Sequence, residues 1–105
     1  MANYVLTYFG GNPPSSPEEG EQHMARYKAW LAALGDTAVS PMNPIKYTQT
    51  IQSDASSSVG SATSMSGYTI IAAESMEEAV AVAKACPFLE VGGTLEVGEL
   101  IAMGG

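Results

Sequence analysis

Two stretches of the chain read as strands with two apolar faces. Residues 3–9 are mostly aromatic and β-branched, a composition that favours a strand. Because side chains alternate along a strand, one face carries Tyr4, Leu6 and Tyr8 and the other carries Val5, Thr7 and Phe9. A second run, residues 68–73, follows Gly67 and is equally apolar on both sides. Neither strand has a face polar enough for water, so we expect this sheet to be covered on both sides.

Two Ser-x-x-Glu boxes predict the starts of two helices. In such a box the serine hydroxyl accepts from the amide three residues on, while the glutamate reaches back. The first box runs from Ser16 to Glu19, with Pro17 at the first helical position, and Gly35 ends that helix. The second box begins at Ser75, and Pro87 stops the second helix.

Each predicted helix has one apolar face. At about 100° per residue, the stripe of the first helix comprises Gly20, Met24, Tyr27, Leu31 and Leu34, with His23 and Trp30 on one flank. The arc of the second helix comprises Met76, Ala79, Val82, Ala83 and Cys86. These residues are mostly small, so the helix can lie close to a sheet. Cys86 on this arc is interpreted as a buried filler in preference to a reactive thiol.

The middle and the end of the chain complete the strands. Pro41 and Pro44 confine a strand to about residues 45–52, at a sheet edge or after a bent start. Residues 53–66 are rich in Ser, Gly, Ala and Thr, which predicts a flexible loop that is either a lid or disordered. A final strand follows the Gly92-Gly93 turn, with a bulge or bend at Gly98, and holds Val97, Leu100, Ile101 and Met103.

The predicted order of elements is therefore β-α-β-β-α-β in a single domain, residues 1–105. Two right-handed crossovers around a central hairpin give an α+β, ferredoxin-like fold, a four-stranded antiparallel sheet with both helices on one face. The other face would stay bare, although its strands are apolar. A second copy of the same sheet is the economical cover. We therefore expect a homodimer through the open sheet face.

Composition and charge narrow the classes of partner. Hydrophobic residues make up 46% of the 105 residues, and the formal charge is −7 with only four basic side chains. This charge argues against nucleic acid and against an anionic membrane surface as partners. One His and one Cys cannot form a standard metal site. The N-terminal sequence has no leader-like pattern, so we expect a cytoplasmic protein.

His23 is the candidate catalytic residue. Histidine exchanges a proton near neutral pH, and Asp36 or Asp54 would orient the imidazole if the fold brings either within hydrogen-bond reach. The alternative is a structural histidine at the flank of a helix. An aromatic pocket for a planar molecule would be lined by Tyr27, Trp30, Tyr47 and Tyr68, although aromatic side chains at this spacing are more often core.

Two segments resemble the YCII-related family. They are Gly67-Tyr-Thr-Ile-Ile-Ala-Ala-Glu-Ser-Met-Glu-Glu-Ala with the run from Ala83 to Val97, and Gln22-His-Met-Ala-Arg-Tyr-Lys-Ala-Trp. The resemblance implies a dimeric α+β barrel with a pocket in each subunit between sheet and helices. It also implies a site centred on a histidine and an aspartate. The histidine position corresponds to His23, and the family's Asp-Pro-aromatic element reads Cys86-Pro87-Phe88 here.

Two functions of different class follow from these observations. In the first, the protein is a cofactor-free lyase or isomerase that uses His23 as general acid/base on a small aromatic or enolic molecule. In the second, it is a small-ligand-binding or regulatory dimer without chemistry. A cofactor-free monooxygenase is a third option, by analogy with other dimeric α+β barrels alone.

Overall fold

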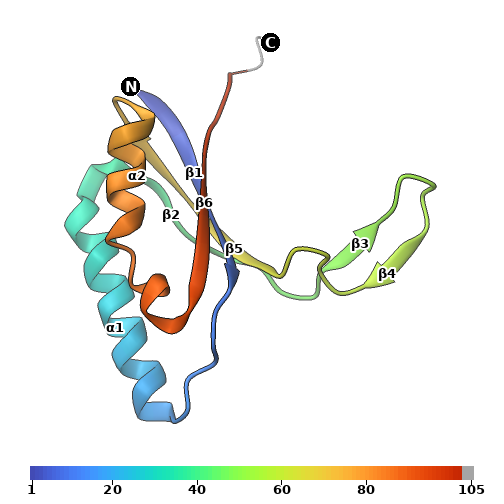
Figure 1. The fold of residues 1–105 in the computed structure, drawn as a ribbon. Coiled ribbons are helices and arrows are strands. Elements are labelled where there is room, and N and C mark those ends of the chain that lie inside the picture. The colour runs from blue at the N-terminus through green and yellow to red at the C-terminus, as the bar shows by residue number, and fades with distance from the viewer. Residues whose placement is uncertain (103–105) are drawn as a thin grey trace.

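A computed structural model describes residues 1–102 of the chain. Its main sheet has four antiparallel strands in the order β2-β5-β1-β6 (Figure 1). The strands are β1 (Ala2–Gly10), β2 (Ala38–Pro44), β5 (Met65–Ala73) and β6 (Gly93–Glu99). The two helices are α1 (Pro17–Leu34) and α2 (Met76–Lys84), and short 3-10 helices follow each of them, η1 (Gly35–Thr37) and η2 (Pro87–Val91). This α+β arrangement is compatible with a ferredoxin-like fold.

Both helices begin where the capping boxes predict. The Ser16 hydroxyl accepts from the Glu19 amide at 3.1 Å, and the Ser75 hydroxyl accepts from the Glu78 amide at 3.2 Å. The two glutamate side chains do not accept from the backbone amides of the capping serines. Glu19 accepts from the Ser15 hydroxyl, and Glu78 accepts from the Glu74 amide at 3.3 Å. Each helix start therefore satisfies one amide through its serine, and the glutamate fastens the segment just before the helix.

The core lies between the sheet and the helices, which Figure 1 shows on the same side of the sheet. Its central residues are Tyr4 and Leu6 of β1, Ile71 and Ala73 of β5, and Ala79 and Ala83 of α2. Ala79 and Ala83 of α2 are buried, so this helix packs close to the sheet, as its small-residue arc predicts. Cys86 is also buried, at 2% exposure, in agreement with its interpretation as a filler.

The second face of the sheet is apolar and only half covered. Val5 of β1 and Ile70 and Ala72 of β5 point to this face and are half-buried. In residues 1–102 no helix lies over them (Figure 1). The expectation of a sheet with two apolar faces therefore agrees with the structure, and one of these faces remains available.

The predicted strand at residues 45–52 is wrong as a strand of the main sheet, because only residues 49–51 of it are a strand and these belong to a separate two-stranded sheet. The sheet strand is β2, residues 38–44, and it contains both prolines that were expected to exclude it. It is an edge strand, where a proline does not interrupt the ladder if its nitrogen faces outward. The pairing with β5 shifts register between Ala38 and Ser40 and again between Ser40 and Asn43. These irregularities accommodate the prolines.

Residues 45–64 form a projecting arm and not only a loop. Within this arm, β3 (Gln49–Ile51) pairs with β4 (Ser57–Val59) as a two-stranded antiparallel sheet that extends away from the helices (Figure 1). The radius of gyration is 15.2 Å, against about 13 Å for a compact chain of this length. The arm explains this excess. It does not cover the side of the molecule where the helices lie, so its position is not that of a lid.

The last strand is shorter than predicted. It ends at Glu99, and one further hydrogen bond, from the Leu100 amide to the Asn3 carbonyl oxygen at 2.8 Å, continues its pairing. Ile101 is 78% exposed, and Met103 lies outside the described residues. Gly98 pairs in regular register with Val5, whereas the register shift of β1 falls between Tyr8 and Phe9, opposite β5. Neither helix of residues 1–102 has the length and apolar composition needed to cross a membrane.

Candidate functional site

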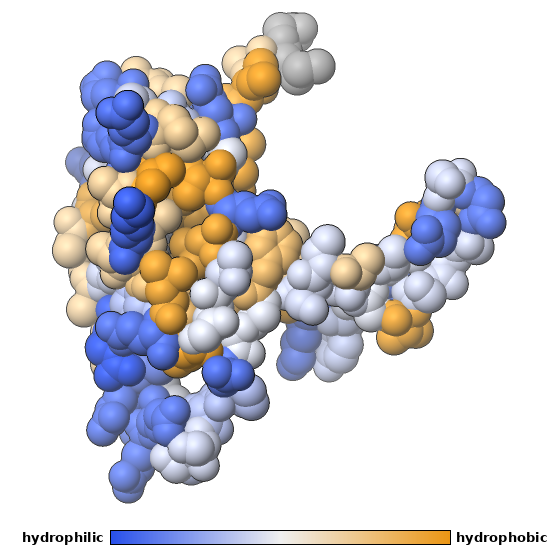
Figure 2. Space-filling model, in the orientation of Figure 1, coloured by the Kyte–Doolittle hydropathy of each residue, from blue (hydrophilic) through white to orange (hydrophobic). Residues whose placement is uncertain are grey.

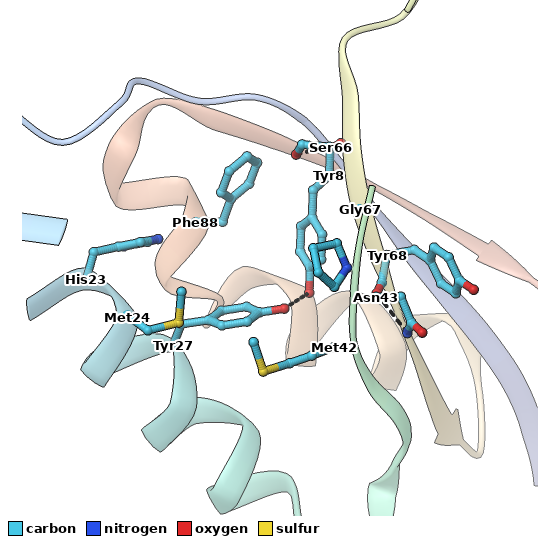
Figure 3. Close-up of a pocket in the computed structure, with 11 residues that line it drawn as sticks. Tyr8, His23, Met24, Tyr27, Met42, Asn43, Ser66, Gly67, Tyr68 and Phe88 are labelled. Carbon is cyan, nitrogen blue, oxygen red and sulfur yellow. Dashed lines mark hydrogen bonds between the residues drawn. The ribbon is translucent and has the colours of Figure 1, made fainter. Parts of the chain in front are cut away.

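A cavity of about 230 Å³ lies between α1, η2 and the ends of β2 and β5 that adjoin the arm (Figure 3). Its walls are mainly apolar and aromatic. They are formed by Tyr8, His23, Met24, Tyr27, Met42, Asn43, Pro44, Ser66, Gly67, Tyr68 and Phe88. These residues come from both ends of the chain and from its middle, so only the folded sheet brings them together. An apolar cavity with a few convergent polar groups is the usual form of a small-molecule site.

Three hydroxyl groups meet at one side of the cavity. The Tyr27 hydroxyl donates to Tyr8 Oη at 3.1 Å, and Tyr8 Oη lies 2.5 Å from Thr69 Oγ1. The Thr69 hydroxyl donates to the carbonyl oxygen of Pro41 at 2.7 Å. Thr69 is fully buried and Tyr8 is 6% exposed. This chain of hydrogen bonds connects α1, β1, β5 and β2.

Aromatic packing holds the tyrosines in place. The ring of Tyr8 meets Tyr27 edge-on at 6.1 Å between centroids and meets Phe88 edge-on at 5.3 Å. Two glycines make the space for Phe88, since a Cβ at Gly93 or Gly11 would lie 2.2 or 2.8 Å from its ring atoms. Phe88 therefore forms a wall of the cavity because residues 11 and 93 have no side chain.

Burial keeps the inner groups of the site neutral. It raises the pKa of the Tyr8 phenol far above its ordinary value, so Tyr8 does not act as a phenolate base near neutral pH. Burial likewise raises the pKa of the Cys86 thiol. A thiol that keeps its proton is a poor nucleophile. The imidazole among the lining residues is that of His23, and imidazole is the side chain most often used for proton transfer.

His23 extends from α1 toward Phe88 at the edge of the cavity (Figure 3). The side chain is half-buried, and its Nδ1 is buried without a hydrogen-bond partner among the described residues. His23, which was expected on the flank of the apolar stripe, is therefore more buried than Met24, which was expected within the stripe and is 41% exposed. The face of α1 that packs is rotated toward His23 and Trp30, and this rotation brings the imidazole to the cavity.

The acidic partners proposed for His23 do not reach it. Asp36 lies in η1, beyond the opposite end of α1, and at about 1.5 Å per residue the two are roughly 20 Å apart along the helix. Asp54 is on the arm, where its carboxylate accepts from the Ser56 amide and hydroxyl at 2.9 and 2.6 Å. The predicted pairing of His23 with Asp36 therefore does not form in this structure. Spacing along the sequence could not show that the helix separates the two residues.

The four predicted aromatic residues occupy different places. Tyr27 lies at the cavity, and Trp30 packs behind it at 5.8 Å between ring centroids, against the core. Tyr47 is 89% exposed on the arm and far from an enclosed position. Tyr68 borders the cavity, but Figure 3 shows its side chain pointing away from it.

Sequence reasoning missed eight of the eleven residues that line the cavity. These are Tyr8, Met24, Met42, Asn43, Pro44, Ser66, Gly67 and Phe88. The alternation of residues 3–9 places Tyr8 on the covered face, but a strand pattern cannot tell where the core stops and a cavity begins. Phe88 follows Pro87 in the element singled out by the family resemblance, which was the one available signal.

Residues 1–102 contain no group of three or more His, Cys, Asp or Glu side chains able to hold a metal ion. On the rim of the site, Arg26 of α1 pairs with Glu90 of η2 at 3.0 Å. Both side chains are about half exposed, so the pair contributes little to stability. No protein-family model matches the chain, and no curated protein is significantly similar to it.

Proposed function

We propose that the cavity binds a small planar molecule, aromatic or enolic, and that His23 transfers a proton on it. The protein would then be a cofactor-free lyase or isomerase. The observation that carries this proposal is the half-buried imidazole at the edge of an apolar cavity. Its Nδ1 is enclosed, so Nε2 is the nitrogen that would exchange a proton with a ligand. A proton-transfer group has to lie within reach of the substrate and be free of competing bonds.

The shape and chemistry of the cavity support a planar ligand. Its volume of about 230 Å³ is below the usual range for drug-sized molecules, which begins at about 300 Å³. Met24, Met42 and Phe88 provide apolar and polarisable walls for a ring. The imidazole lies at the edge of the cavity, and the hydroxyls of Tyr8 and Tyr27 lie at the other side (Figure 3). Asn43 and Ser66 also line the cavity.

The surroundings of Tyr8 and His23 indicate different roles for the two side chains. The Tyr8 phenol holds its proton firmly and contributes to binding and shape, not to proton abstraction. His23 takes a proton from one carbon or oxygen of the substrate and returns it to another. This requires only one group that can both accept and release a proton.

Tautomerisation of a neutral enol tests the catalytic proposal. Benzoylacetone combines a phenyl ring with an enolisable diketone, and its enol and keto forms have distinct ultraviolet spectra. We expect the protein to accelerate their interconversion. His23→Gln should reduce the rate by about 10²-fold, the usual contribution of a positioned acid/base. Gln22→Ala, at the exposed position next to His23 on α1 and outside the cavity lining, is the matched control and should retain the rate. Equal rates for wild type and His23→Gln would exclude the acid/base role.

A second function is a ligand-binding or regulatory protein without chemistry. The observation in its favour is the distance of both proposed carboxylates from His23, because histidine bases are commonly oriented by a hydrogen-bonded partner. In this case benzoylacetone binds without any rate acceleration. Binding is followed through shifts of amide signals from residues around the cavity.

We also infer a ferredoxin-like fold of the YCII-related type, assembled as a homodimer through the open sheet face. The strand order β2-β5-β1-β6 with both helices on one side supports the fold. The half-buried apolar residues Val5, Ile70 and Ala72 on the other side support the interface. Sedimentation at micromolar concentration measures the mass directly. A species of one chain mass would contradict the dimer.

A further inference from the structure

The hydroxyl network at the cavity has one direction. The Thr69 hydroxyl gives its single proton to the Pro41 carbonyl oxygen at 2.7 Å, and a carbonyl oxygen only accepts. In the 2.5 Å contact between Tyr8 and Thr69, the donor is therefore Tyr8. The Tyr27 hydroxyl donates in turn to Tyr8 Oη at 3.1 Å. All three protons point inward, toward the backbone of β2.

This direction determines what Tyr27 offers to a ligand. Tyr27 is the outermost of the three hydroxyls, and its proton is already used inside the network. The Thr69 Oγ1 atom, 3.3 Å away, is an alternative acceptor for that same proton and not a donor to Tyr27, since the Thr69 proton is on the Pro41 carbonyl oxygen. Among residues 1–102 no donor reaches the Tyr27 oxygen. The oxygen of Tyr27, which lines the cavity, therefore keeps a free lone pair for a ligand.

Ligands that donate and ligands that accept gain unequally from such a group. An N–H or O–H donor adds a hydrogen bond to Tyr27 Oη and leaves the network unchanged. A ligand that only accepts has to take the Tyr27 proton, which Tyr8 Oη now accepts. The hydrogen bond from Tyr27 to Tyr8 is then lost when the bond from Tyr27 to the ligand forms. The net difference is one hydrogen bond, which corresponds to about 2- to 10-fold in affinity.

We propose that this cavity selects planar molecules that carry a hydrogen-bond donor, with Tyr27 Oη as the selecting acceptor. An enol or phenol hydroxyl or a ring N–H is the matching group. The inference rests on the proposed function of the same cavity and names the class of molecule that the cavity takes. The apolar side chains of Met42 and Phe88 hold the ring, and the inward direction of the network gives the preference.

Indole and benzofuran form a matched pair of probes. They share one bicyclic skeleton, in which the N–H donor of indole is replaced by a ring oxygen without a proton. Affinities are measured by NMR titration of the amide signals around the cavity. We expect wild type to bind indole about 2- to 10-fold more tightly than benzofuran. In Tyr27→Phe the affinity for indole should fall to that for benzofuran, because the acceptor oxygen is gone. The affinity for benzofuran should not change, because the aromatic ring at position 27 remains.

Tyr68→Phe is the control variant. It also removes a tyrosine hydroxyl, but Figure 3 shows the Tyr68 side chain pointing away from the cavity, so the preference for indole should persist. Equal binding of both probes to wild type would overturn the selection and leave the binding site intact. A preference that survives in Tyr27→Phe would overturn the role of Tyr27. Failure of both probes to bind would overturn the selection together with the proposed function.

Discussion

The body of the molecule and its arm contain similar side chains in opposite environments. In the body, Leu6 and Ile71 are fully buried beneath the helices. In the arm, Ile51 and Val59 belong to paired strands as well, yet they are 65% and 91% exposed. Figure 2 shows apolar surface on the arm, which is otherwise mostly polar, whereas the body has a broad apolar region. The two regions differ because α1 and α2 pack on the main sheet, whereas nothing in residues 1–102 packs on the strands of the arm (Figure 1).

This comparison separates two properties that β-branched residues are often assumed to share. They favour extended backbone wherever they stand. They stabilise the fold only where apolar area is removed from water, by about 25 cal/mol per Å². The arm satisfies the first condition and not the second. Its stability should therefore differ sharply from that of the body.

The largest expected effect is that of a charge placed under the helices. Ile71→Asp introduces a carboxylate at a position with no exposure and no basic partner in the core cluster. An unpaired buried charge should cost about 3–5 kcal/mol in the free energy of unfolding. Urea denaturation followed by circular dichroism measures this loss.

Val5→Asp is the matched control on the other face of the same sheet. Val5 is half-buried and faces away from the helices, so the new carboxylate keeps contact with water. We expect a loss of about 1 kcal/mol or less in the free energy of unfolding of a single chain. A dimer formed through this face should dissociate in the same variant. Equal destabilisation by Ile71→Asp and Val5→Asp would show that the two faces are not distinct.

A smaller effect is expected from alkaline pH, and it arises from the body alone. Burial raises the pKa of both the Cys86 thiol and the Tyr8 phenol, so the folded chain binds these protons more tightly than the unfolded chain does. Their contribution is complete below the ordinary pKa values, about 8.5 for Cys and about 10 for Tyr, and it declines as pH rises above them. Urea denaturation between pH 7 and pH 11 should show this decline.

Cys86→Ala isolates the thiol part of the alkaline effect. This variant should be less stable at pH 7, because it leaves a small cavity in the core. Its stability should nevertheless decline less than that of wild type over the range where the thiol titrates. A decline of the same size in both proteins would assign the effect to other groups.

The helices were predictable because their signals are local. Ser16 and Ser75 cap the residues three positions on, so neighbours in sequence decide where each helix begins. The edge strand was misplaced because Pro41 and Pro44 break a central strand but not an edge strand with shifted register. Whether a strand is central or at the edge depends on its neighbours in space. A single stretch of sequence does not contain that information.

The site was less predictable than the fold for a related reason. His23 was singled out from its side-chain chemistry, and the structure places it at the cavity. Asp36 was proposed as its partner, but α1 separates the two residues because Asp36 lies beyond the far end of the helix. The tyrosine network depends on contacts between residues up to 61 positions apart in sequence, as between Tyr8 and Thr69. Such contacts follow from the register of β1 on β5 and from the bonds of Thr69 to β2.

The smallest expected effect is that of changing the arm. Val59→Ser replaces a side chain that is 91% exposed and that buries little against the rest of the chain. The free energy of unfolding of a single chain should therefore change by less than about 0.5 kcal/mol, in the range of ordinary surface substitutions. Urea denaturation, at a protein concentration low enough that the chains do not associate with one another, measures this change in free energy. A loss near that of Ile71→Asp would mean that the arm folds against a covered surface, and the contrast between arm and body would not hold.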